Sequence, residues 1–74
     1  MVKHKVGDLV LMVLKTYERR YQYLGIIKRV DDAMRVQDFV FLVEWDDGQE
    51  NWYSSESIEE MKADLWTYYE SQNR

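Results

Sequence analysis

The sequence predicts a mainly β fold, a small barrel of four to five antiparallel strands followed by a C-terminal α-helix. Three observations lead to this prediction. Short apolar runs separated by turn residues occupy the first three quarters of the chain. Asp47-Gly48 stands between two of these runs, and Asp-Gly is a strong hairpin signal because glycine reaches positive φ without steric cost. A helical spacing of apolar residues begins only at Ser57.

The strands follow from the apolar runs. They are expected at Leu9–Leu14, Leu24–Val30, Phe39–Trp45 and Gln49–Tyr53, with longer loops over 15–23 and 31–38. Gly25 marks a point where the second strand can bend or be approached closely. The third strand is apolar on both faces until Glu44, which is typical of a central strand in a small barrel.

The helix is expected over residues 57–70. Its apolar residues, Ile58, Met61, Leu65, Trp66 and Tyr69, fall on one helical stripe. Ser57 and Glu60 have the spacing of a capping box. Strands this short need a closed or strongly curved sheet to bury both faces, so a barrel is expected over 6–56. Barrel and helix together are expected to form one domain over 1–74.

Length and composition limit the function classes. The chain has 74 residues, a net charge of -4 and no cysteine, which excludes disulfides, cysteine-bound zinc and thiol chemistry. No apolar run approaches the roughly 18 residues that a membrane span needs, and the amino terminus lacks a signal-peptide core. We therefore expect a soluble, intracellular protein of the cytoplasm that does not associate with membranes.

Charge is distributed unevenly along the chain. Residues 1–35 hold eight of the ten Lys and Arg against four acidic residues, whereas residues 36–74 hold two basic and ten acidic residues. If these halves occupy different faces, the protein has one basic and one acidic side, and the basic side suits phosphate.

Nothing in the sequence indicates catalysis. His4 is the only imidazole and lies in a basic amino terminus that we expect to be mobile. The acidic residues around Gly48 lack the spacing of a calcium-binding loop, and such residues are common in turns: Asp46, Asp47 and Glu50. We therefore expect no catalytic residue, no metal and no cofactor, and a protein that is not an enzyme.

Aromatic residues are in surplus, with eleven in the chain. A small core needs about half of them, and Phe39 or Phe41, Trp52 and Trp66 are the expected core members. Three tyrosines, Tyr17, Tyr21 and Tyr23, alternate with arginines in the polar loop 15–23, where they suit contact with a ligand.

Three segments carry a family resemblance: Gly7-Asp8-Leu9-Val10, Tyr23–Val30 and Val43-Glu44-Trp45-Asp46-Asp47-Gly48. Over residues 6–58 they resemble the Tudor-like branch of the SH3-like barrels. The resemblance implies an SH3-like (Tudor-like) barrel and an aromatic cage for methylated lysine or arginine, formed by Tyr17, Tyr23, Trp45 and Asp47. Gln49 departs from the pattern, because such readers often have an aromatic residue after the glycine. The size and layout also resemble small uncharacterised SH3-like proteins of tailed bacteriophages.

Three functions follow as hypotheses. The first is a binding module that contacts a peptide or protein through the loop 15–23 and the hairpin tip 45–49, with Trp45 at the ligand and Trp52 in the core. The second is weak nucleic-acid binding through the basic half, chiefly Arg19, Arg20, Tyr21, Lys28 and Arg29, with Lys15 and Arg35 nearby. The third is a structural or assembly role through the helix, as in a phage protein. If the helix only completes the core, we expect a monomer.

Overall fold

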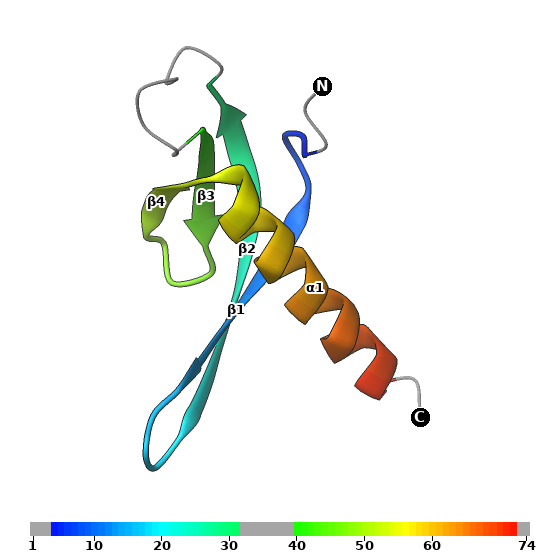
Figure 1. Ribbon diagram of the computed structural model, residues 1–74. Coiled ribbons are helices and arrows are strands. Elements are labelled where there is room, and N and C mark those ends of the chain that lie inside the picture. Colours follow the sequence, from blue (N-terminus) through cyan, green and yellow to red (C-terminus); the bar gives the residue numbers. More distant parts are fainter. Residues whose placement is uncertain (1–3, 32–39, 73–74) are drawn as a thin grey trace.

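A computed structural model describes residues 4–31 and 40–72 of the chain (Figure 1). In order, it contains β1 (Leu9–Lys15), β2 (Arg20–Val30), β3 (Phe41–Trp45), β4 (Glu50–Tyr53) and α1 (Ser55–Gln72). The four strands form one antiparallel sheet in the order β1-β2-β3-β4. The prediction of a mainly β fold with a C-terminal helix is confirmed.

The sheet is open, so the closed barrel that the sequence predicted is not formed by the described residues. β1 and β4 are its two edges, and each pairs with one neighbour only. Instead of a further strand, α1 packs against β1 as it crosses the sheet (Figure 1). A helix can cover apolar side chains of an edge strand, but it cannot pair with the strand's backbone.

The hairpin of β1 and β2 is longer than predicted. Its pairing continues to Lys15 opposite Arg20, so most of the expected loop 15–23 is strand. A short turn closes it, in which the Thr16 amide donates to the Arg19 carbonyl at 2.7 Å and the Thr16 hydroxyl accepts from the Arg19 amide at 3.0 Å. We call residues 12–23 the arm, because they extend away from the rest of the sheet (Figure 1).

One face of the sheet packs against the start of α1 to form the core. The core residues are Val10, Ile27, Phe41, Val43 and Trp45 from the sheet and Ile58 and Met61 from α1. Register explains this set, because cross-strand partners such as Ile27 and Val43 share a face. Each large apolar side chain buried here contributes about 1.5–3 kcal/mol relative to an exposed one.

Both tryptophans that were predicted to be in the core, Trp52 and Trp66, lie outside it. Trp52 is half-buried and pairs with Leu42 on the face opposite the core, whereas Trp45, expected at the ligand, is only 5% exposed. Trp66 is 69% exposed despite its place on the apolar stripe. Of the two predicted phenylalanines, Phe41 is in the core, and Phe39 falls outside the described residues, as does most of the predicted loop 31–38.

The helix begins at Ser55, two residues before the predicted start, because Ser54 is the capping residue. The Ser57 amide donates to the Ser54 hydroxyl at 3.2 Å, and the Ile58 amide donates to the Ser54 carbonyl at 3.0 Å. Beyond Met61 the helix and the arm diverge, and a hollow of about 630 Å³ separates them. Trp66 does not border this hollow; it borders a second one, of about 370 Å³, together with Leu9 and the turn residues Gly7 and Asp8. No helix of the described chain combines the length and the apolar character of a membrane span.

Candidate functional site

The candidate site is a hollow of about 250 Å³ between the arm and the turn that joins β3 to β4. We call it the arm pocket. Its lining comprises three aromatic residues, two aliphatic residues of β1 and the polar residues of the turn and β4: Tyr23, Trp45, Tyr53, Met12, Leu14, Asp47, Gln49 and Asn51. Met12 and Tyr23 are cross-strand partners and therefore share the face of the arm that borders the pocket.

Trp45 and Tyr53 form one rigid unit at this pocket. The indole Nε1–H of Trp45 donates a hydrogen bond to the Tyr53 hydroxyl at 3.1 Å. The two rings lie edge to face, with centroids 5.8 Å apart and planes at 90°. Because Trp45 is almost fully buried, it forms part of the wall and presents little ring surface to a ligand.

Gly25 makes the buried position of Trp45 possible. It lies opposite Trp45 in the register of β2 and β3. A Cβ atom on Gly25 would lie 2.7 Å from Trp45 Cε3 and 2.7 Å from Val43 Cγ1, which is closer than real contacts allow. The indole therefore packs directly on the backbone of β2, as the glycine in the sequence indicated.

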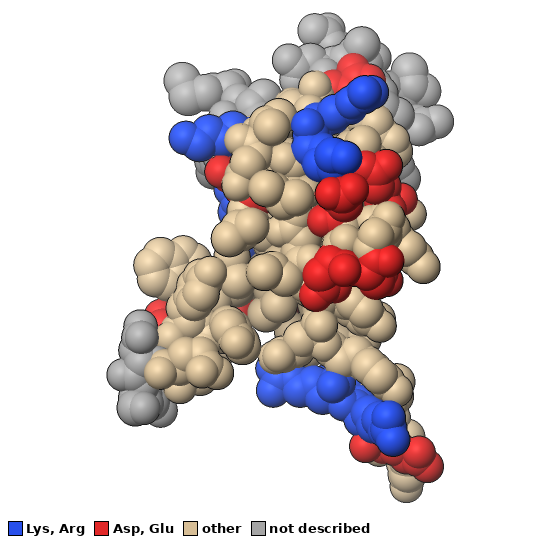
Figure 2. Space-filling model, turned by 180° about the vertical axis from the view of Figure 1, so that it is seen from behind, with Lys and Arg blue, Asp and Glu red and all other residues tan. Residues whose placement is uncertain are grey.

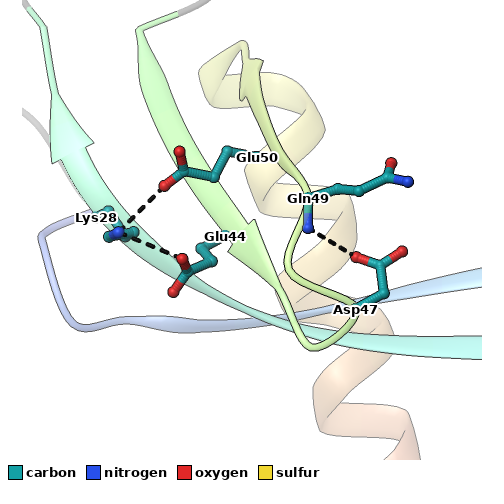
Figure 3. A network of polar contacts seen from close by, with 5 residues as sticks. All are labelled: Lys28, Glu44, Asp47, Gln49 and Glu50. Carbon is teal, nitrogen blue, oxygen red and sulfur yellow. Dashed lines mark hydrogen bonds and ion pairs between the residues drawn. The ribbon is translucent and has the colours of Figure 1, made fainter.

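The turn after β3 is held by its own acidic residues. The Gln49 amide donates to Asp47 Oδ1 at 3.0 Å, which draws the carboxylate of Asp47 toward the turn backbone (Figure 3). Gly48 has a φ of 88°, a conformation that favours glycine. The turn thus places one carboxylate at the rim of the arm pocket.

Asp46 ties the same turn to β2, one residue beyond the arm. Its amide donates to the Leu24 carbonyl at 2.9 Å, and its Oδ2 accepts from the Leu24 amide at 3.3 Å. These bonds fix the position of the turn relative to β2.

The structure brings together three of the four residues that the resemblance placed in a cage. Tyr23, Trp45 and Asp47 line the arm pocket. Tyr17 does not, because it is fully exposed in the turn at the far end of the arm. Tyr53 is an aromatic neighbour that sequence reasoning missed. The alternation of Asn51 and Tyr53 along one face of β4 was the available signal.

The residues considered for nucleic-acid binding are divided between two places. Arg19, Arg20 and Tyr21 lie at the end of the arm. Lys28 lies instead among carboxylates, with its Nζ 3.1 Å from Glu50 Oε2 and 3.3 Å from Glu44 Oε2 (Figure 3). Hydrogen bonding to Glu50, followed by that to Glu44, raises the pKa of Lys28 above its ordinary value. Lys28 therefore stays protonated, and the two carboxylates offset its charge.

The pairing of β2 with β3 is irregular between Ile27 and Arg29. Arg29 comes directly after this irregularity and is exposed. Arg35 lies outside the described residues.

His4 is buried, contrary to the mobile position expected from its place in the sequence. Its ring meets Phe41 edge to face, with centroids 5.4 Å apart. No described residue lies in hydrogen-bonding geometry with either ring nitrogen, although the backbone of Ser55 is near. Burial, and then the charge of Lys62, hold the pKa of His4 below its ordinary value. The ring is thus a neutral packing element.

A turn holds the residues that follow His4 against the sheet. The Lys5 amide donates to Asp8 Oδ2 at 3.0 Å, and the Gly7 amide donates to the Ile27 carbonyl at 2.9 Å. The N-terminal segment from His4 onward is therefore an ordered part of the fold.

Within residues 4–31 and 40–72, no cluster of His, Asp or Glu side chains is arranged to hold a metal ion. No protein-family model, no curated protein and no solved structure matches the chain. The chemistry of the arm pocket is therefore the main guide to function.

Proposed function

We propose that this protein is a non-catalytic binding module that accepts a side chain of a peptide or protein partner in the arm pocket. One observation carries the proposal: Tyr23, Tyr53 and the carboxylate of Asp47, which are far apart in the sequence, border one hollow. Aromatic side chains with a polar end are typical of surfaces that contact partners.

The lining favours a positively charged side chain. Aromatic faces attract cations, with about 0.5–2 kcal/mol per contact, and Asp47 adds a negative charge at the rim. Met12 and Leu14 would contact the aliphatic part of such a side chain. This agrees with the ligand class that the resemblance to Tudor-like SH3-like barrels implies, but with Tyr53 in place of Tyr17.

The test uses lysine peptides, unmodified and trimethylated, with NMR chemical shifts as the readout. We expect the Tyr23 and Tyr53 ring signals and the Trp45 indole N–H signal to move together, while Tyr17 stays unchanged. Tyr23→Ala should weaken binding by about tenfold or more. Tyr17→Ala is the matched control, since it removes the same ring outside the pocket. Shifts confined to the end of the arm would contradict the proposal.

One observation favours a second function, weak binding of single-stranded nucleic acid. The end of the arm gathers Lys15, Arg19 and Arg20 beside the exposed rings of Tyr17 and Tyr21. Few cations take part, so binding should be weak and should fall steeply with salt. A titration with labelled oligonucleotides at low salt tests it, and Arg19→Ala with Arg20→Ala should abolish any binding seen.

A further inference from the structure

The face of the sheet opposite the core carries an apolar patch. Leu9, Leu24 and Ile26 are 39%, 42% and 38% exposed. Leu9 and Ile26 are cross-strand partners, and Leu24 lies two residues before Ile26 on the same face. We call these three residues the outer patch. A shallow hollow of about 200 Å³ borders all three, and each keeps more than a third of its surface exposed.

Charges of opposite sign border the outer patch on two sides. Lys15 and Arg20 are cross-strand partners on the arm, in the register that places them on the same face as Leu24. Glu44 pairs with Ile26 across β2 and β3, and Glu50 pairs with Glu44. Figure 2 shows this face, with basic side chains on the arm, an uncharged area next to them, and beyond it acidic side chains that lie beside further basic ones.

The acidic side keeps a net negative charge. Glu44 and Glu50 share the single ammonium of Lys28. Asp46 adds a further carboxylate at the border of the outer patch. On the basic side, neither Lys15 nor Arg20 forms an ion pair with another described residue.

We propose that the outer patch binds a second copy of this chain. In an antiparallel, two-fold arrangement with its axis near Leu24, the arm of each copy lies over the β3 and β4 side of the other. Lys15 and Arg20 then meet the partner's acidic side chains twice, while the two apolar patches cover one another. A two-fold contact needs a self-complementary surface, and this face supplies both charges and the apolar centre between them.

A second copy fits better than an unrelated partner because this one surface carries both the basic and the acidic side chains that the contact needs. Sheets that pack face to face lie about 10 Å apart, a distance at which long Lys, Arg and Glu side chains reach across. The exposed ring of Trp66 borders a second hollow that includes Leu9, so it extends the apolar surface toward α1. This dimer differs from the monomer expected from the sequence.

Sedimentation equilibrium of the full chain over a concentration series tests the proposal. We expect the average mass to rise toward twice the monomer mass as concentration increases. Leu24→Lys should raise the dissociation constant by about tenfold or more. Leu14→Lys is the matched control, because it introduces the same charge at a leucine of similar exposure on the opposite face of the arm. Ile26→Lys provides a second variant, and circular dichroism verifies that each variant folds.

Charge reversal tests the orientation of the two copies. Lys15→Glu with Arg20→Glu should weaken the dimer, as should Glu44→Lys with Glu50→Lys. Combining all four substitutions should restore it, because the signs are exchanged on both sides. A mass that stays at the monomer value at millimolar concentration would overturn the proposal. So would equal effects of Leu24→Lys and Leu14→Lys, or failure of the combined variant to recover.

Discussion

The indole N–H of Trp45 donates its hydrogen bond to the hydroxyl of Tyr53, 3.1 Å away, and this bond joins the core to the arm pocket. Trp45 is a core residue, while Tyr53 is half-buried and borders the pocket. Their edge-to-face contact fixes the Tyr53 ring where a ligand would meet it. Under the proposed function, stability and binding are therefore coupled at this pair.

Tyr53→Phe should destabilise the fold by about 1–3 kcal/mol, because it leaves a buried indole donor without its acceptor. Urea unfolding measures the loss, and the Trp45 indole N–H signal should shift in the folded state. Tyr17→Phe removes the same hydroxyl from a fully exposed ring and should change stability by less than about 0.5 kcal/mol. Equal effects of the two substitutions would show that the bond contributes nothing.

Gly25→Ala should destabilise the fold by about 1–3 kcal/mol or more through overpacking. The added methyl would overlap Trp45 Cε3 and Val43 Cγ1, which both lie in the core. Thermal unfolding measures the change, and near-ultraviolet circular dichroism reports any movement of the indole.

Gly48→Ala is the informative comparison for Gly25→Ala. Nothing lies within 4 Å of a Cβ atom at Gly48, so its penalty, about 1 kcal/mol, comes only from the positive φ. Gly48→Asn should recover part of it, since asparagine tolerates that conformation, whereas Gly25→Asn should be worse than Gly25→Ala.

The ion pair between Lys62 and Asp8 joins α1 to the N-terminal turn, with Nζ 2.7 Å from Oδ2. The hydrogen bond from Lys62, aided by the Lys5 amide, holds the pKa of Asp8 below its ordinary value of 3.8. A lowered carboxyl pKa contributes stability above pH 3.8, and that contribution is lost as pH falls through the folded pKa. Lys62→Met should raise the Asp8 pKa in an NMR titration and lower stability at pH 7 by at most about 1 kcal/mol, because both side chains are partly exposed.

Local signals in the sequence predicted the strands and the C-terminal helix, but not the open sheet. The Asp47-Gly48 hairpin, the apolar residues of β3 and the start of the helical period all depend on neighbouring residues, and each lies close to its predicted place. The arm was missed because Tyr21 and Tyr23 were interpreted as ligand contacts, although their alternation with Gln22 has the period of a strand.

Features that depend on long-range packing were not predictable from the sequence. The exposure of Trp66 depends on how α1 lies against the N-terminal turn and Leu9, and no residue near Trp66 in the sequence specifies that placement. The exchange of roles between Trp45 and Trp52 follows from the register of β3 and β4, since a change of one residue moves a side chain to the other face. Tyr53 enters the arm pocket for the same reason.

His4 should make the fold less stable in mild acid. Its neutral ring is buried against Phe41, and burial together with Lys62 lowers its pKa, while Glu59 and Asp8 oppose the shift. In the unfolded chain the ring takes up a proton near pH 6.5, whereas in the folded chain it does so only at lower pH. The contribution of His4 to the free energy of unfolding is therefore fully present above pH 6.5. As the pH falls from 6.5 to the folded pKa, this contribution decreases with a slope of at most about 1.4 kcal/mol per pH unit.

Urea unfolding at pH values from 7.5 to 5 measures this slope, and the His4 ring signals report its pKa in the folded state. His4→Phe keeps an aromatic ring against Phe41 but cannot take up a proton, so the part of the slope between pH 6.5 and 5 that belongs to His4 should disappear. Asp8 does not interfere, because its lowered pKa places its titration below pH 3.8. A His4 pKa at or above 6.5 would contradict the assignment of this ring as a neutral packing element.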